Sequence, residues 1–143
     1  SHTSRRKTGA AGVMYGPPGH AYVYLVYGMH WCFNVVAEAD GTPGAVLVRA
    51  VEPLHGLEVI RRNRGRAMPD RNLTSGPGKL CQAFAIDGDL HGADVTGDDL
   101  WFETAREPAG EIVSGPRIGV DYAGEWAEAP WRFRLAGNRY VSR

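Results

Sequence analysis

The aromatic side chains between Tyr22 and Asn34 are the first candidates for function in this sequence. Tyr22 and Tyr24 alternate along a run that is typical of a β-strand, so both face the same side of it. Tyr27 begins a tight turn that also contains Met29, and a second strand follows. Aromatic groups on a projecting hairpin are costly to leave in water. The pattern therefore indicates stacking, packing against a partner, or prising a partner open.

Arg49 is a charged residue within a stretch that otherwise suits burial. The range Ala45–Val51 predicts a strand whose alternation puts Leu47, Arg49 and Val51 on one face. A buried arginine must be paired with a carboxylate or a phosphate. An arginine at the edge of a sheet can instead hold its guanidinium in water, and the sequence leaves both possibilities open.

A third candidate is the stretch from Thr74 to Lys79, which opens a helix predicted over Lys79–Ile86. A hydroxyl cap followed by glycines and a lysine leaves free backbone N–H groups at the positive end of a helix. Such an end can bind phosphate, although the same pattern is also typical of an ordinary capped helix. The spacing is not that of a nucleotide-binding P-loop, which argues against nucleotide hydrolysis.

A single α+β domain over residues 1–143 is expected to position these candidates: a curved, mainly antiparallel β-sheet with a protruding hairpin and two or three α-helices. The expected strands are Ala21–Tyr27, His30–Ala37, Ala45–Val51, Leu100–Glu103, Arg117–Val120, Trp131–Leu135 and Tyr140–Ser142. The expected helices are Lys79–Ile86 and Pro53–Asn63, the latter with an apolar stripe of Leu54, Leu57 and Ile60, and a turn or short helix is expected over Tyr122–Trp126.

The charge of the chain is balanced overall but uneven along its length. Its 16 basic and 16 acidic residues give a formal net charge of zero. Basic residues dominate from Arg49 to Lys79, and acidic residues dominate from Asp87 to Glu128. A polyanion could bind the basic part, because contact is local and salt screens the distant acidic part. Alternatively, the arginines after residue 60 are only the solvated end of a helix.

Other patterns limit the class of protein. The sequence has no apolar run of the length that spans a bilayer and no basic-then-apolar leader, so we expect a soluble, cytoplasmic protein. Cys32 and Cys81 lack metal-type spacing and are expected to be buried free thiols. No metal or other cofactor is expected.

Several segments, taken together and in order, resemble the alkyladenine (3-methyladenine, methylpurine) DNA glycosylase family of bacterial type. Any one segment is a weak signal, whereas the ordered set covers nearly the whole chain and is highly specific. The segments are His2 to Thr8, Met14 to Gly19, Tyr22 to Tyr24, Tyr27 to Asn34, Val48 to Leu54, Ser75 to Ala83 and Gly124 to Trp126.

The resemblance implies a monomeric base-excision-repair enzyme that acts on double-stranded DNA without a cofactor. Such an enzyme flips an alkylated or deaminated purine out of the duplex and hydrolyses its N-glycosidic bond, leaving an abasic site. The substrates of the family are 3-methyladenine, 7-methylguanine, hypoxanthine and ethenoadenine. Association with the bacterial nucleoid would follow from DNA binding.

The resemblance also implies roles for individual residues. Tyr27 matches the residue that fills the gap left in the base stack, and Met29 and His30 flank it in the minor groove. The remaining matches are His2 and Tyr24 against the flipped base, Asn34 as a filter against the amino group of guanine, Arg49 beside the catalytic water, and Thr8, Gly78 and Lys79 at DNA phosphates.

The sequence departs from the family at the general base. In the family, a glutamate on a Glu-x-Tyr segment precedes the pocket histidine, whereas this sequence begins at Ser1-His2. The given chain can be part of a longer enzyme, another chain can supply the segment, or the protein can be a degenerate homologue that binds damaged DNA without base excision. A further alternative is a non-catalytic nucleic-acid-binding module. Gly9 to Gly12 also replace a family Pro-Arg-Asn that contacts the DNA backbone.

Overall fold

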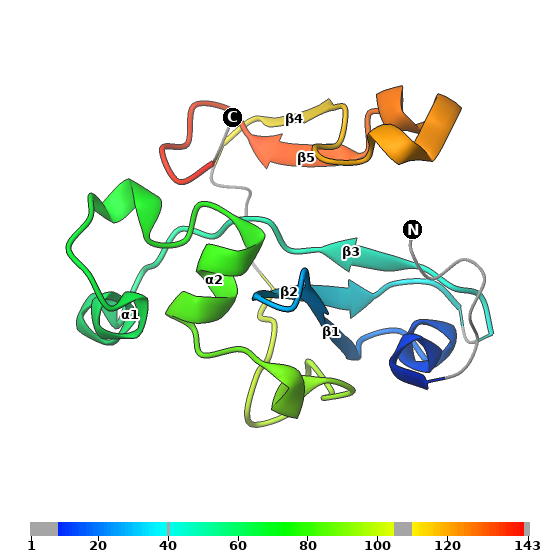
Figure 1. Ribbon diagram of the computed structural model, residues 1–143, viewed down its shortest axis with the longest axis horizontal. Helices are drawn as coiled ribbons and strands as arrows, with labels where there is room; N and C mark the ends of the chain where they lie inside the picture. The colour runs from blue at the N-terminus through cyan, green and yellow to red at the C-terminus, as the bar shows by residue number, and fades with distance from the viewer. Residues whose placement is uncertain (1–8, 40, 105–109, 142–143) are drawn as a thin grey trace.

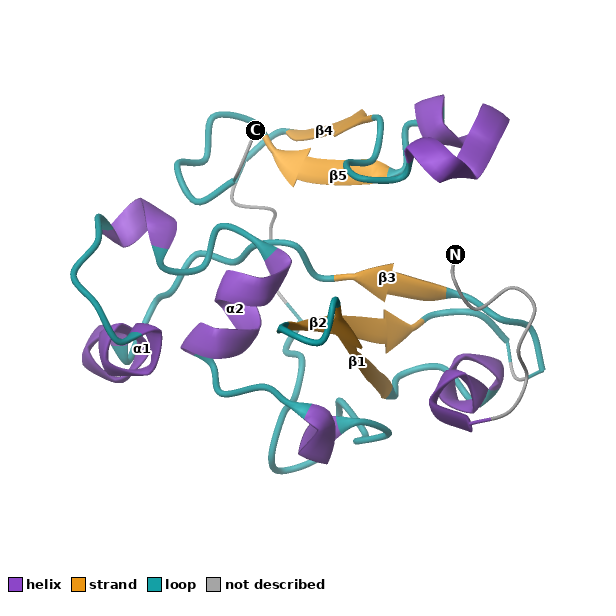
Figure 2. Cartoon of the chain, viewed as in Figure 1, coloured by secondary structure: helices purple, strands orange, loops and turns teal. Residues whose placement is uncertain are grey.

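The computed structural model describes residues 9–39, 41–104 and 110–141, which form an α+β fold with two antiparallel sheets (Figures 1 and 2). The first sheet has the strand order β1-β2-β3, and the second pairs β4 with β5. The predicted fold class is therefore confirmed. The described part also contains two α-helices, α1 and α2, and four 3-10 segments at Gly9–Tyr15, Asp70–Asn72, Gly88–Leu90 and Asp121–Glu128.

The aromatic hairpin forms as the alternation predicts. Strand β1 covers Ala21–Val26 and β2 covers His30–Val36, each one residue shorter than expected. Val26 pairs with His30, and the amide of Met29 donates to the carbonyl of Val26 over 3.1 Å. The three residues between the strands make a tight turn, as the sequence indicates.

Strand β3 is shorter than predicted, because it covers only Ala45–Leu47 instead of reaching Val51. One further backbone hydrogen bond, from Val48 N to Phe33 O over 3.0 Å, keeps the chain beside β2. The carbonyl of Val51 then accepts a hydrogen bond from the Thr74 hydroxyl over 2.6 Å, so this backbone group bonds outside the sheet. Arg49 therefore lies just after the strand rather than within it.

Helix α1 covers Leu57–Arg64 and begins later than the predicted Pro53. Gly56 precedes it with φ of 73°, a left-handed conformation that glycine adopts readily and that ends the preceding loop. Leu54 is 79% exposed and is no part of an apolar stripe, which corrects the prediction. Leu57 and Ile60 do pack inward, against Leu73 and Ala83.

Helix α2 covers Pro77–Ala83 instead of Lys79–Ile86. Proline suits its first turn because proline has no N–H to leave unpaired there. No side chain caps the helix at Gly76, so the predicted hydroxyl cap is wrong. The cap position falls on Gly76, which has no side chain, and the Thr74 hydroxyl two residues earlier donates to Val51 O.

The second sheet consists of β4, at Ile112–Gly115, and β5, at Arg132–Leu135. Strand β5 was expected, whereas the strands predicted at Leu100–Glu103 and Arg117–Val120 do not form. Trp101 makes only an isolated bridge with Thr96, and the Arg117 side chain bonds to Trp126 O over 3.1 Å. Residues 140 and 141 lie in a turn and a bend instead of the predicted strand, whose Ser142 lies outside the described residues. The turn or short helix expected over Tyr122–Trp126 lies within the 3-10 segment Asp121–Glu128, whose two helical pieces are separated by a kink at Gly124 with φ of 61°.

The two faces of the β1–β2 hairpin have different environments. Val23 and Phe33 belong to the main hydrophobic cluster, with Leu80 and Cys81 of α2. Figure 1 shows α2 lying beside this sheet, whereas β4 and β5 run along the side of β3. Cys81 and Cys32 are both buried free thiols, as predicted. The tyrosine face is packed as well: Tyr22 is buried in a second cluster with Met14 and Val36, whereas Tyr24, which packs against that cluster, is only half-buried.

In the described ranges, no helix is long and apolar enough to cross a membrane. The same residues contain no group of three or more His, Cys, Asp or Glu side chains that could hold a metal ion.

Leu73 is fully buried between the two helices. Leu73→Ala should therefore lower the free energy of unfolding by about 2–5 kcal/mol, because the substitution removes buried methyl groups and leaves a cavity. The matched control Leu54→Ala should change it by less than about 0.5 kcal/mol, because Leu54 is exposed. Urea unfolding followed by circular dichroism measures both. Equal losses in the two variants would contradict this assignment of the core.

Candidate nucleic-acid interface

The register of the hairpin gathers four side chains on one face. Tyr22 pairs with Asn34, and Tyr24 pairs with Cys32, so all four project to the same side of β1 and β2. The rings of Tyr22 and Tyr24 lie 5.2 Å apart between centroids, with a tilt of 35°. The buried Asn34 donates from Nδ2 to the carbonyl of Tyr22 over 3.1 Å. Both the tyrosine ring and the amide are thus held in fixed orientations.

Tyr24 remains a neutral phenol over the whole physiological range. Burial, followed by neighbouring groups that become negative, first among them the Cys32 thiol, raises the pKa of Tyr24 to about 12. A hydrogen bond joins the Tyr24 and Cys32 side chains. The half-buried ring is therefore a neutral, aromatic wall.

Arg49 lies beside this wall, and no carboxylate among the described residues pairs with it. Burial lowers the pKa of Arg49, and the positive charge of Arg132 lowers it further, whereas Cys32 and Tyr24 act in the opposite direction. Its Nε is buried and has no hydrogen-bond partner, and the described residues form no ion pair with it. The sequence left open whether Arg49 is buried or lies at a sheet edge with its guanidinium in water. This partial burial argues against a fully solvated guanidinium. A partly buried guanidinium of this kind can receive an anion.

The turn of the hairpin presents large side chains to solvent. Tyr27 is 92% exposed and Met29 is 73% exposed, and His30 is exposed as well. Tyr27 has φ of 53°, a left-handed conformation that costs a non-glycine residue about 1–3 kcal/mol. Gly28 has φ of 67° at no such cost. Core packing does not account for a strained, exposed tyrosine, so its position requires another explanation.

The N-terminal end of α2 approaches the turn closely. A Cβ added at Gly78 would lie only 3.3 Å from Cβ, Cγ and Nδ1 of His30. Glycine at this position therefore permits the contact between the helix and the turn. Lys79, the next residue in the helix, is exposed. The structure thus brings His30, Gly78 and Lys79 together, although they are far apart in sequence.

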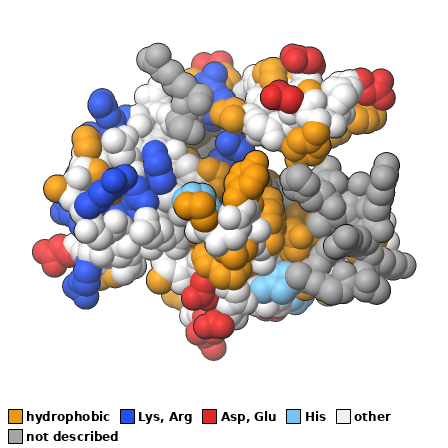
Figure 3. Space-filling model, in the orientation of Figure 1, with side chains coloured by type: hydrophobic (Ala, Val, Ile, Leu, Met, Phe, Trp, Pro, Cys, Tyr) orange, Lys and Arg blue, Asp and Glu red, His pale blue; other side chains and the backbone are white. Residues whose placement is uncertain are grey.

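Charge is distributed unevenly around this site. Figure 3 shows Lys and Arg side chains gathered over α1 and α2, next to hydrophobic side chains at the hairpin. Acidic side chains lie along the lower edge of that view and over the second sheet. The basic and acidic residues that are separated along the sequence are therefore also separated on the surface of the protein.

Two candidate residues, His2 and Thr8, lie outside the described residues. Two residues that the sequence analysis did not select lie near the site. Tyr122 and Arg132 interact electrostatically with Tyr24 and Arg49, respectively, and were not selected from the sequence. About a hundred residues separate them from the hairpin, so no local pattern links them; the nearest signal was the Gly124-Glu125-Trp126 segment.

Comparison with known proteins identifies the family. The family model for methylpurine-DNA glycosylase matches residues 1–139. The chain belongs to the methylpurine-DNA glycosylase family. Members of this family are DNA glycosylases of base excision repair, so DNA is the partner.

Individual relatives agree with the family match. A protein of Methanocella arvoryzae is 50% identical over 99% of this chain and 71% of its own length, and one of Carboxydothermus hydrogenoformans is 50% identical over 99% and 73%. A protein of Alkaliphilus oremlandii is 47% identical over 92% of this chain and 68% of its own length. Each carries the name of a proposed 3-methyladenine DNA glycosylase.

The titration of Tyr24 tests the environment of its ring in this protein. The absorbance of the wild-type protein at 295 nm minus that of Tyr24→Phe should show a step centred at about pH 12. Because the folded pKa exceeds the unfolded value of about 10, the unfolded state binds fewer protons between these values. The contribution of Tyr24 to stability is therefore present below pH 10 and is lost as the pH rises toward 12. A step centred near pH 10 would show that Tyr24 is solvated.

Proposed function

We propose that this chain recognises an alkylated or deaminated purine in duplex DNA, flips it out of the helix and takes part in hydrolysing its N-glycosidic bond. The observation that carries the proposal is one juxtaposition. Tyr24, Asn34 and Arg49 lie beside one another, at the foot of a hairpin whose turn presents the strained and exposed Tyr27. An extruded base and the wedge that replaces it need such neighbouring sites.

In this proposal Tyr27 enters the minor groove and fills the gap left by the extruded base. Unstacking a base pair costs a few kcal/mol, which an inserted aromatic ring offsets by stacking in its place. Met29 and His30 flank the wedge in the groove, because they follow it in the same turn and are exposed. The backbone strain at Tyr27 is then the cost of holding the ring away from the sheet.

The face of β1 and β2 receives the base. The ring of Tyr24 stacks on the purine, and an alkylated purine is electron-poor, which favours stacking on an electron-rich phenol. His2 would contact the same base from a segment outside the described residues. Asn34 Nδ2 donates to Tyr22 O, which fixes the amide, and in this proposal that fixed amide disfavours the amino group of guanine.

The phosphates next to the lesion bind at the N-terminal end of α2. Its first backbone N–H groups lack a capping side chain, and Lys79 adds a positive charge beside them. Gly78 lets this end lie against the turn, so the phosphate-binding end of α2 and the hairpin turn are neighbours. Thr8 would add a contact from outside the described residues.

The chemical step needs a water molecule that attacks C1′ of the sugar while the bond from C1′ to the base nitrogen breaks. A general base takes the proton of the water, and the departing purine takes the electron pair of the broken bond. In this proposal Arg49 holds the water and the carboxylate that activates it. Glu52 does not serve as that carboxylate, because it is exposed and its Oε2 accepts a hydrogen bond from Asn138 over 3.3 Å.

A second candidate function is binding of damaged DNA without excision. It is favoured by one observation: no carboxylate among the described residues shifts the pKa of Arg49. Release of hypoxanthine from a duplex that contains inosine separates the two functions. Release supports the glycosylase, whereas tight binding of an abasic-site duplex without release supports the binding protein. If the chain neither releases the base nor prefers the abasic-site duplex, the proposed function is wrong.

Tyr27→Ala should weaken binding to an abasic-site duplex by about tenfold or more, because the gap in the stack stays unfilled. Tyr27→Phe is the matched control and should bind like the wild type, since the ring is kept. Fluorescence anisotropy with labelled duplex measures both. Wild-type affinity in Tyr27→Ala would remove the wedge from the account.

Arg49→Gln should slow base release under single-turnover conditions by about 100-fold, while changing DNA affinity much less, because Arg49 holds the attacking water and the carboxylate that activates it. Arg134→Gln serves as the control, since Arg134 is an exposed arginine of β5. A variant at position 49 that releases the base at the wild-type rate would show that the guanidinium is structural.

A further inference from the structure

The exposed side of α2 leads away from the hairpin turn toward α1. Gly78 and Gln82 are four residues apart, and Lys79 and Gln82 are three apart, so they share one side of the helix. Leu80 and Cys81 are buried on the other sides. A ligand that follows this exposed side from the turn reaches Gln82 after about 6 Å, since an α-helix rises about 1.5 Å per residue.

The end of α1 is joined to this exposed side. Asn63 donates from Nδ2 to the carbonyl of Ala83 over 2.9 Å, and Arg64 donates to Oε1 of Gln82. A second guanidinium nitrogen of Arg64 contacts Met68 Sδ over 3.4 Å. Arg64 is therefore held beside Gln82 rather than extended freely into solvent.

Two adjacent arginines at this place lack an acidic partner. Burial lowers the pKa of Arg64, and the positive charge of Arg66 lowers it further, so the two guanidinium groups repel each other. The Nε of Arg64 is buried and unpaired, and no ion pair to either arginine occurs within the described part of the chain.

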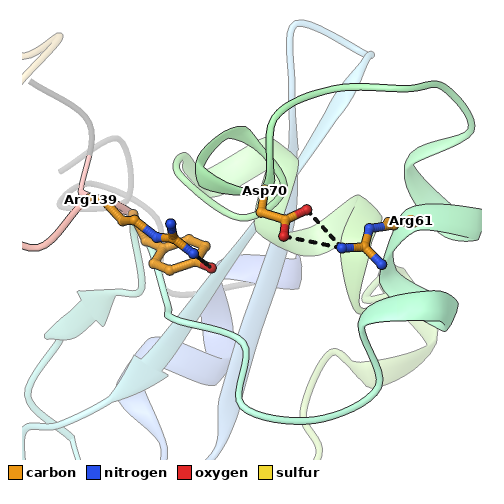
Figure 4. Close-up of polar contacts among 4 residues, drawn as sticks. Arg61, Asp70 and Arg139 are labelled. Carbon is orange, nitrogen blue, oxygen red and sulfur yellow. Dashed lines mark hydrogen bonds and ion pairs between the residues drawn. The ribbon is translucent and has the colours of Figure 1, made fainter.

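Arg61 differs from them, because Asp70 neutralises it. Its guanidinium donates to both carboxylate oxygens of Asp70, over 2.9 and 3.1 Å. Figure 4 shows the carboxylate directed at Arg61, with Arg139 farther away on the other side of Asp70. Asp70 is therefore engaged by Arg61, and no ion pair joins it to Arg64 or Arg66 among the described residues.

We propose that Arg64 and Arg66 form a second phosphate-binding site, which holds the DNA backbone beyond the phosphates bound at Lys79. This inference rests on the proposed function, because it extends the same DNA surface. The path from the turn along α2 to Arg64 is about 6–12 Å, which corresponds to about two to four base pairs at 3.4 Å each. The site thus contacts undamaged DNA on one side of the lesion.

An alternative role for these arginines is electrostatic support of the helix end, because cations near a helix C-terminus stabilise it. Arg62 offers a matched control. It lies two residues before Arg64, hence on the opposite side of α1, and Glu58 precedes it by four residues on its own side. Removing its charge changes the net charge of the protein as much as removing that of Arg66.

The test compares the wild type, Arg66→Gln, Arg64→Gln and Arg62→Gln on duplexes that carry a tetrahydrofuran abasic-site analogue. The duplexes have long flanks on both sides or a flank shortened to two base pairs on one side or the other, and Kd is measured against salt concentration. Because Arg66 is exposed, Arg66→Gln should keep the wild-type thermal unfolding midpoint. Arg66→Gln therefore tests the site even if Arg64→Gln unfolds.

We expect the wild type and Arg62→Gln to lose about tenfold in affinity when one particular flank is shortened, and Arg66→Gln to be insensitive to that change. The slope of log Kd against log salt should fall by about 0.9 in Arg66→Gln, as for one lost phosphate contact. An unchanged slope and an unchanged flank effect in Arg66→Gln overturn the second site. If the wild type shows no preference for the abasic site, the proposed function fails, and the slopes on undamaged duplex still decide whether Arg66 binds phosphate.

Discussion

The register between β1 and β2 is the constraint on which the site depends. Tyr22 opposite Asn34, and Tyr24 opposite Cys32, place a tyrosine wall and a fixed amide on one face and the apolar core residues Val23 and Phe33 on the other. Side chains alternate with a period of two, so a slip by one residue would exchange the two faces. The packing of α2 against the core face excludes such a slip.

The second determinant is positive charge that the described part of the fold leaves uncompensated. Arg49 has a buried Nε without a partner, and its charged neighbour Arg132 disfavours the cation further. Arg64 and Arg66 repeat this arrangement at the end of α1. Placing like charges together lowers stability unless an anion lies between them. A DNA-binding protein accepts that cost because phosphates supply the anion on binding.

Local patterns in the sequence predicted the hairpin, its turn and the buried cysteines, because alternation and turn chemistry act over a few residues. The end of β3 was missed because Val51 O bonds to the Thr74 hydroxyl, 23 positions away, and the cap of α2 was missed because the cap position falls on Gly76, which has no side chain. Strand β4 lacks a strong pattern and exists through its pairing with β5. The family resemblance selected Tyr24, Asn34 and Arg49, and the structure adds that they are neighbours. Arg132 and Tyr122 come to them only through tertiary folding.

The central claim is that the face of β1 and β2 receives an extruded base while the hairpin turn fills the gap. The emission of ethenoadenine, a fluorescent purine, differs between the stacked and unstacked base, so it reports extrusion directly. Mixing the protein with a duplex that contains one ethenoadenine should give an increase in emission that follows binding and saturates with it. Saturated binding with the emission of the free duplex would contradict the account, because the base would then still be stacked.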